Sequence, residues 1–230
     1  MTGATSSWAV RDGIGKRGGE DEGICMVEKA RGDTVLAALR ARRSNGRVKP
    51  DPVPRALVER VIEAAMWAPN HHRTDPWRFV ALTGAARNRL GEVMAASLAA
   101  RLDDPAGERA TTRLEKERNK PLRAPVLIAV AALPSPEPRA VEVEEVAAVA
   151  AAVQNMLLAA EALGLAAIWR TGDAAYDPAV KAFLGLPEGA HLVAIVYLGY
   201  PEYRPSAEQE RPGDATMYTT WLDAEGPVDV

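Results

Sequence analysis

Apolar and polar residues follow one another along the chain in patterns typical of helices and of buried strands. The spacing of Val35, Leu36 and Leu39 predicts a helix that Asp33 caps and that ends at Arg43. Further helices are expected over residues 54–68, 85–102, 103–120, 141–163 and 177–185. Short apolar stretches predict strands over residues 77–82, 125–133, 165–170 and 190–198. Helices and strands are interspersed without regular βαβ spacing, which favours an α+β fold.

The predicted helix 141–163 differs from the others because it is apolar on nearly every face beyond its first turn. Glu142, Glu144 and Glu145 lie at its start, where negative charge complements the helix dipole. A helix with this composition is buried all round, either in a large core or against a partner subunit. A single domain of this size has little room for such a helix, so the pattern predicts a dimer.

The two ends of the chain differ in composition from its centre. Residues 1–32 are rich in Gly, Ser and charge without periodicity, and we expect a flexible N-terminal extension before a single domain, 33–230. Residues 13–18 match a dinucleotide-binding fingerprint but lack the flanking strand and helix, so a linker is the better interpretation. Tyr203, Tyr218 and Trp221 lie in a Pro-rich tail that we expect to dock on the partner subunit.

Composition excludes several classes of protein. The net charge of −3 gives no global electrostatic case for nucleic acid, and 47% hydrophobic with 26% charged residues is typical of a globular domain. Cys25 is the one cysteine, which excludes a disulfide framework and a cysteine-based metal cage. No apolar run has the length of a membrane span, and no secretory signal is visible, so we expect a cytoplasmic protein away from membranes.

A cluster of cations follows the first predicted helix. Arg42, Arg43 and Ser44 are adjacent, and Arg47 follows three residues later. Guanidinium groups with a serine hydroxyl form a compact site for a phosphate. The alternative is a basic helix end that complements its own dipole, with Arg47 in solvent.

The segment from Trp67 to Trp77 places two Trp and two of the three His of the chain in a predicted loop. Indole and imidazole rings offer stacking faces and hydrogen-bond donors to a planar ligand, and we single out Trp67 and His71. Adjacent histidines rarely chelate one ion, so we predict no metal site. The alternative is that Trp77 fills the core and that His71 and His72 are solvated.

A third cluster follows the predicted strand 165–170. Trp169, Arg170 and Thr171 are succeeded by Gly172, so an aromatic ring, a cation and a hydroxyl gather at a strand end, where ligands often bind. The alternative is a plain turn. No nucleophile–base pair or paired carboxylates accompany these clusters, so we expect no catalytic side chain and infer that a cofactor supplies the chemistry.

Taken in order, these clusters resemble the nitroreductase family of FMN-dependent NAD(P)H oxidoreductases. Arg42-Arg43-Ser44 is similar to its opening R-R-S signature, and Ala68-Pro69 with Asp75-Pro76-Trp77 is similar to its A-P…Q-P-W segment. Residues 163–172 and Leu198-Gly199-Tyr200-Pro201 resemble its G-L-G…W and L-G-Y-P segments. The spacing of Arg47 and the runs at residues 69–71 and 168–172 resemble the YdjA-like subgroup. Asp75 stands where the family usually has Gln or Glu.

The resemblance implies an α+β sandwich with a mainly antiparallel central sheet flanked by helices, in an intertwined homodimer. FMN would lie at the subunit interface. Arg42 and Ser44 would bind its phosphate or ribityl chain, with Arg43 close by, and Arg47 would also belong to the cofactor-binding residues. Trp67 and His71 would approach the flavin from their loop, in the site of the same chain or of the other subunit. Trp169, Arg170 and Thr171 would line the ring and phosphate end.

The resemblance also implies a ping-pong reaction. NADH or NADPH would give a hydride to FMN, and an electron-poor small molecule such as a nitroaromatic or a quinone would take the electrons. Two alternatives belong to other classes: a protein that binds or stores flavin without turnover, and a structural protein with no flavin.

Overall fold

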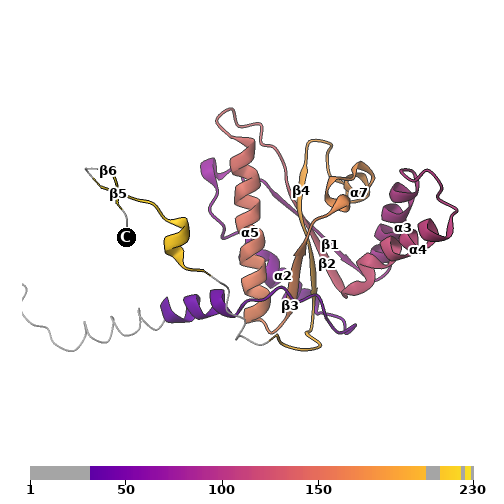
Figure 1. The fold of residues 1–230 in the computed structure, drawn as a ribbon, viewed down its shortest axis with the longest axis horizontal. Helices are drawn as coiled ribbons and strands as arrows, with labels where there is room; N and C mark the ends of the chain where they lie inside the picture. Colours follow the sequence, from indigo (N-terminus) through magenta and orange to yellow (C-terminus); the bar gives the residue numbers. More distant parts are fainter. Residues whose placement is uncertain (1–31, 206–212, 224–225, 229–230) are drawn as a thin grey trace, which may run out of the picture. The chain divides into compact units, whose positions relative to one another are not determined.

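The computed structural model describes residues 32–205, 213–223 and 226–228, and its centre is a four-stranded antiparallel sheet (Figure 1). The strand order is β1-β2-β4-β3. The strands are β1 (Trp77–Thr83), β2 (Val126–Ala132), β3 (Ala166–Arg170) and β4 (His191–Gly199). All four were predicted from apolar runs, and the α+β fold with an antiparallel sheet is confirmed.

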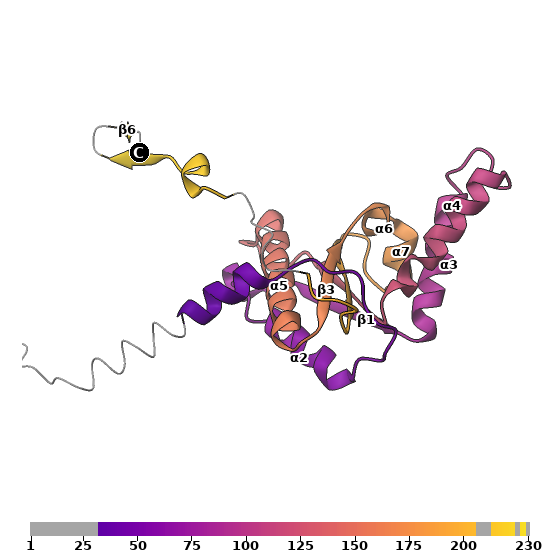
Figure 2. The ribbon, with the colours of Figure 1, turned by 60° about the horizontal axis from the view of Figure 1, so that its bottom comes forward.

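Helices cover both faces of this sheet (Figures 1 and 2). The helices α2 (Arg55–Ala65) and α5 (Glu142–Ala162) pack on one face. The other face is covered by α3 (Ala85–Ala99), α6 (Asp173–Tyr176) and α7 (Pro178–Phe183). The helix α4 (Glu108–Asn119) packs against α3, and the 3₁₀ turn η2 (Lys120–Arg123) leads from it into β2.

The central strand β2 is buried at all seven of its positions. Ile128 points to the α2 and α5 face, whereas Leu127 and Ala129 point to the α3 face. Successive side chains of a strand point to opposite faces, so a strand without polar positions requires cover on both sides. This requirement explains why helices flank the sheet on both faces.

Helix α5 contributes the largest share of the apolar core on its face of the sheet. Val149, Val153 and Met156 are fully buried against the strands. Among the described residues α5 is the one helix long and apolar enough to cross a membrane, yet only 44% of its most apolar 18-residue window is buried. Here it lies on the sheet as a core helix, and most of the other residues of the window are half-buried within one chain.

Several boundaries differ from those expected. The first described helix covers residues 32–41, so Asp33 lies inside it, and it ends before Arg43. Pro54 precedes α2 as its N-cap instead of opening it, and α6 was not predicted because it is a single short turn. In the tail, expected to be irregular, β5 (Trp221–Asp223) and β6 (Gly226–Val228) pair after the 3₁₀ turn η3 (Ala215–Tyr218).

The domain boundary predicted at residues 32/33 stays a prediction. The chain divides into two compact units at Leu39 and Arg40, and the described residues of the first unit, 32–39, are helical. Cys25 and the predicted flexible extension, apart from residue 32, lie outside the described residues.

Two identical substitutions on α5 test the packing. Val149→Ala removes two buried methyl groups and should lower the free energy of unfolding by about 2 kcal/mol. Val143→Ala, at a side chain that is 71% exposed, should change it by less than about 0.5 kcal/mol. Urea denaturation of both variants provides the measurement, and equal losses would contradict the placement of α5.

Candidate functional site

The basic segment after the first helix is fixed beside β3 by a buried asparagine. The backbone N–H of Asn45 donates to the Ala167 carbonyl at 3.1 Å. Its side-chain Nδ2 donates to the Tyr203 carbonyl at 2.8 Å, and its Oδ1 accepts a hydrogen bond from the Arg47 N–H at 3.0 Å. Asn45 therefore joins the segment both to the edge strand of the sheet and to the chain that follows β4.

Gly46 lies where this segment meets the end of β3. A Cβ atom at Gly46 would lie 3.4 Å from Nη2 of Arg170 and 3.4 Å from Cγ2 of Ile168. These are contact distances, so the backbone at Gly46 lies directly against both side chains. The predicted phosphate-binding segment and the predicted ring-binding cluster are thus neighbours in the fold.

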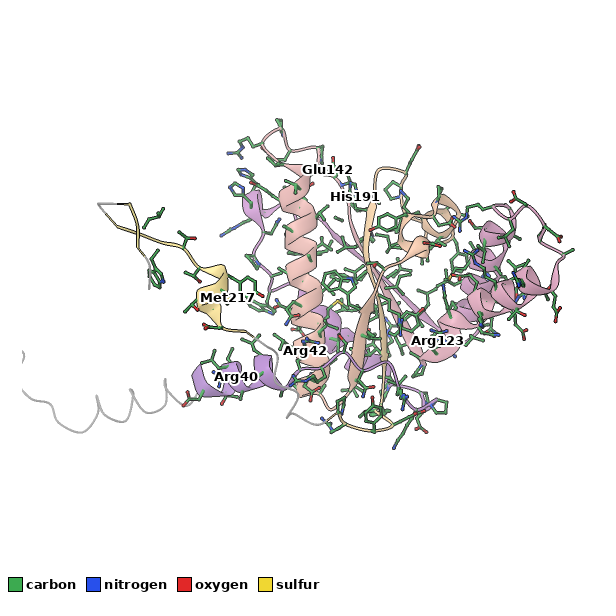
Figure 3. All side chains as sticks on the ribbon, viewed as in Figure 1. Arg40, Arg42, Arg123, Glu142, His191 and Met217 are labelled. Atoms are coloured by element: carbon green, nitrogen blue, oxygen red, sulfur yellow. The ribbon has the colours of Figure 1, made fainter. Side chains whose placement is uncertain are left out.

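The four residues predicted for the phosphate differ in exposure. Arg42 is buried, and Figure 3 shows it near the C-terminal end of α5. The Arg43 guanidinium donates to the carbonyls of Arg40 and Arg42. Ser44 and Arg47 are exposed, and the Arg47 guanidinium lies 5.6 Å from the centre of the Tyr203 ring. Ser44 and Arg47 are therefore the members of the cluster most accessible from solvent.

A cavity of about 360 Å³ opens at the end of β3, and we call it the β3 cavity. Its charged lining includes Lys120, Arg123 and Arg170. Its apolar lining consists of Met94, Ile168, Trp169, Ala174, Ile195 and Tyr197. Thr171, Gly172 and Asp173 complete the rim on the side of α6. An apolar floor with a few charged groups around it is typical of a small-molecule site.

Cations are in excess around the β3 cavity. The cavity is lined by three cations, Lys120, Arg123 and Arg170, and by two carboxylates, Glu117 and Asp173. Glu117 already forms an ion pair with Lys120 at 2.5 Å. The Arg170 guanidinium lies 5.5 Å from the centre of the Tyr197 ring. Such a site attracts an anionic or electron-rich ligand.

The helices α3 and α4 determine where Lys120 and Arg123 lie. A Cβ atom at Gly91 of α3 would come within 2.0 Å of the Arg118 carbonyl oxygen. Only glycine permits this approach of α4 to α3, and η2 follows directly from α4. The close packing of these helices thus positions two cations of the cavity.

Trp169 points to the other face of the sheet from Arg170. Its indole Nε1 donates to the Val193 carbonyl at 3.0 Å, and the ring packs against the core under α5. In the cluster Trp169–Thr171, the side chains of Arg170 and Thr171 therefore lie nearer the cavity, whereas the Trp169 indole packs against the core.

The loop from Asn70 to Pro76 has an unusual backbone. His72, Arg73 and Asp75 have positive φ angles of 61°, 53° and 46°. The Asn70 side chain supports this conformation, because its Oδ1 accepts from the Asp75 N–H at 2.9 Å and its Nδ2 donates to Thr74 Oγ1 at 3.3 Å. Left-handed backbone at non-glycine residues costs about 1–3 kcal/mol each and is concentrated at functional sites.

Within one chain, this loop is far from the β3 cavity. His71 Nδ1 lies 2.7 Å from Glu144 Oε2 in the first turn of α5, and its ring stacks on His72. Arg43 and Asn45 instead border Glu161, near the other end of α5. Glu161 follows Glu144 by 17 positions, which corresponds to about 25 Å of helix. The structure therefore does not bring His71 together with the basic segment of its own chain.

Two more polar contacts lie at the same end of α5. His191 Nε2 is 2.5 Å from Glu142 Oε1, and both residues are labelled in Figure 3. Glu145 is buried and accepts a hydrogen bond from the Ser135 N–H at 3.0 Å. In the described part of the chain, no group of three or more His, Cys, Asp or Glu side chains is arranged to hold a metal ion.

Sequence analysis did not identify Asn45, Lys120, Arg123 or Tyr197. Lys120 and Arg123 belong to a stretch with many charges, where nothing singles out a functional cation. Tyr197 could have been identified, because it is the residue with a hydroxyl in an otherwise aliphatic predicted strand. The role of Asn45 could not be predicted, because it depends on a hydrogen bond to Tyr203, which is distant in sequence.

Tyr197 makes a testable contribution to the pH dependence of stability. Burial raises the pKa of its phenol above the usual range, and the nearby Arg170 and Arg123 partly oppose this increase. The unfolded chain therefore releases this proton first as pH rises, and the native state loses stability above about pH 10. Urea denaturation from about pH 8 to about pH 11 should show a steeper loss in the wild type than in Tyr197→Phe, and parallel losses would contradict this account.

Comparison with known proteins assigns the chain to a family. Residues 39–200 match the profile described as "Nitroreductase family". The chain is 33% identical over 190 residues to YdjA of Escherichia coli K12, whose name assigns it to the NAD(P)H nitroreductases; the match covers 82% of this chain and 99% of that protein.

Solved structures agree with this match. A nitroreductase-like family protein from Bacillus cereus aligns with a TM-score of 0.64 and 27% identity, covering 77% of this chain and 91% of that one. A nitroreductase-type protein from Desulfovibrio desulfuricans, crystallised with FMN, aligns with a TM-score of 0.60 and 29% identity, covering 80% of this chain and 94% of that one. The chain, with its antiparallel sheet and its basic segment beside β3, belongs to the nitroreductase family.

Proposed function

We propose that this protein is an FMN-dependent oxidoreductase that passes electrons from NADH or NADPH to an electron-poor small molecule such as a nitroaromatic or a quinone. The observation that carries the proposal is the β3 cavity, where three cations surround an apolar floor beside the fixed basic segment. Relatives named for NAD(P)H nitroreductase activity and a neighbour crystallised with FMN support it.

The residues around the β3 cavity fit a flavin mononucleotide. The ring system of FMN is planar and largely apolar, which suits Ile168, Ile195 and the buried Tyr197. Its phosphate is a dianion, and Arg and Ser are suitable partners for it. Gly46 lies where the basic segment meets Arg170, so one ligand can contact both.

We assign the holding residues accordingly. Arg42, Arg43, Ser44 and Arg47 bind the phosphate and ribityl chain, and Arg170 and Thr171 border the ring. Trp169 supports this border from the core side, where its indole is anchored. Lys120 and Arg123 join the set, since they border the same cavity.

FMN, when bound, supplies the hydride chemistry. The protein's cations oppose the negative charge that reduction produces, and a partly desolvated site strengthens this effect. Thr171 and Arg170 are exposed, so water reaches the site and can deliver protons without a catalytic side chain.

The proposal includes a homodimer in which each site uses both chains. Fewer than half of the residues in the apolar window of α5 are buried in one chain, and Trp67 is 82% exposed at the end of α2. Because His71 lies about 25 Å along α5 from the basic segment, we propose that Trp67 and His71 complete the site of the partner subunit. The exposed Tyr218 and Trp221 of the tail dock on that subunit. We place the enzyme in the cytoplasm.

The absorbance spectrum of the purified protein tests the function. The protein should be yellow, or become so with added FMN. Anaerobic NADH or NADPH should bleach the flavin absorbance, and a nitroaromatic should restore it. A colourless protein that does not take up FMN would contradict the proposal, and bound flavin that NAD(P)H does not reduce would favour flavin storage instead.

A matched pair of arginine variants tests the site. Arg170→Gln removes a cation of the β3 cavity and should weaken FMN binding by about tenfold, as expected for one charge-assisted hydrogen bond. Arg113→Gln, on the exposed surface of α4, should leave binding unchanged. Fluorescence titration with FMN measures both affinities, and equal affinities in the two variants would remove Arg170 from the site.

A further inference from the structure

A second cavity, which we call the η2 cavity, lies next to the β3 cavity and is also lined by cations. Its volume is about 330 Å³, and its charged lining consists of Lys49, Arg87 and Arg123. The remaining lining residues are Val48, Pro50, Asn88, Leu122, Ala124 and Pro125. Three cations and no carboxylate therefore border this cavity, although the chain as a whole carries a net charge of −3.

These cations have no counter-charge within the described residues. Neither Lys49, Arg87 nor Arg123 forms an ion pair there within 4 Å. Cations that lie close together repel one another, and this repulsion costs free energy unless an anion is present. The arrangement indicates a binding site for an anionic ligand.

Among the cations of the η2 cavity, Arg87 has a guanidinium group that the fold holds in a fixed, partly buried position. It lies in the first turn of α3, and its Nη1 donates to the Ala124 carbonyl at 2.5 Å. Its Nε is buried and has no hydrogen-bond partner in the described structure. A partly desolvated guanidinium without a carboxylate is costly, so its presence needs an explanation beyond stability.

The chemistry of the lining favours phosphate groups. Guanidinium groups bind phosphate through several N–H donors at once, and Lys49 adds a point charge. Three cations suit more than one phosphate, and the cavity volume is that of a small-molecule subsite. Asn88 adds a neutral amide donor at the rim.

The position of the cavity suggests which phosphate-bearing molecule it serves. Arg123 borders both this cavity and the β3 cavity. A ligand anchored here by its phosphates therefore lies directly beside the proposed redox site. We propose that the η2 cavity binds the phosphate groups of the dinucleotide reductant, an inference that rests on the proposed function.

Phosphate could come from two other sources, and each has a distinct consequence. If the FMN phosphate occupied this cavity, loss of a cation here would weaken FMN binding. If free phosphate alone bound here, the loss would weaken binding of inorganic pyrophosphate without changing the use of any reductant. The dinucleotide predicts weaker use of NADH and NADPH, with FMN binding intact.

The test compares reductants with and without phosphate on the FMN-loaded enzyme. In Lys49→Gln, the KM for NADH and NADPH should rise about tenfold with kcat unchanged. The KM for 1-benzyl-1,4-dihydronicotinamide, which has no phosphate, should stay at the wild-type value, and so should the Kd for FMN. Arg60→Gln, an exposed cation of α2 outside both cavities, is the matched control and should match the wild type throughout.

A second variant and a binding measurement distinguish failure of this inference from failure of the proposed function. Arg87→Gln should likewise raise the KM for NADH and NADPH without changing the Kd for FMN. If Arg87→Gln does not fold, Lys49→Gln still provides the test, because the Lys49 side chain is exposed. Calorimetry with inorganic pyrophosphate should show binding to the wild type and weaker binding to Lys49→Gln, even in a protein without turnover. Equal KM changes for all three reductants, unchanged KM values, or a weakened FMN Kd would each overturn the inference.

Discussion

The burial of β2 on both faces is the constraint on which the rest of the structure depends. A strand without a polar position must be covered on both sides, so the chain needs helices on each face of one sheet. With both faces occupied, a ligand can bind only at the ends and edges of the strands. The edge strand β3, whose end carries Arg170 and Thr171, provides that place.

The polar groups at this edge work together because the fold brings three separate segments to β3. Asn45 joins the basic segment to Ala167 and Tyr203, and the close approach of α4 to Gly91 sets η2 on the other side of the strand end. The resulting cationic surroundings suit a redox ring and a phosphate. The adjoining η2 cavity extends the same positive charge, so one region of an acidic chain is specialised for anions.

Much of this architecture could be predicted from the sequence. The four strands were visible because their apolar runs, such as Val126 to Ala132, have the length of a strand and are too short for a typical helix. The basic segment and the end of β3 were visible because cations and an aromatic residue stand out beside apolar runs. Their ordered resemblance to a known family then joined them into one site, and the family was confirmed.

Other features could not be predicted, because they depend on contacts between distant residues. Lys120 and Arg123 became site candidates only once α4 packed on α3, and a charged stretch alone gives no such information. Trp169 was predicted to line the flavin ring, and it does border the β3 cavity, but strand alternation turns its indole to the opposite face, where Val193 accepts its hydrogen bond. The left-handed backbone at His72, Arg73 and Asp75 was not predictable, because most His, Arg and Asp residues adopt negative φ and the conformation here depends on contacts with the Asn70 side chain.

We propose that the end of β3, with the basic segment beside it, forms the flavin site. A crystal structure of the protein prepared with saturating FMN would locate the cofactor. We expect flavin density in the β3 cavity, bordered by Arg170 and Lys120, with the phosphate next to Ser44 and Arg47 of the same chain. Flavin density elsewhere on the molecule, or a phosphate remote from Ser44 and Arg47, would show that the flavin site lies elsewhere.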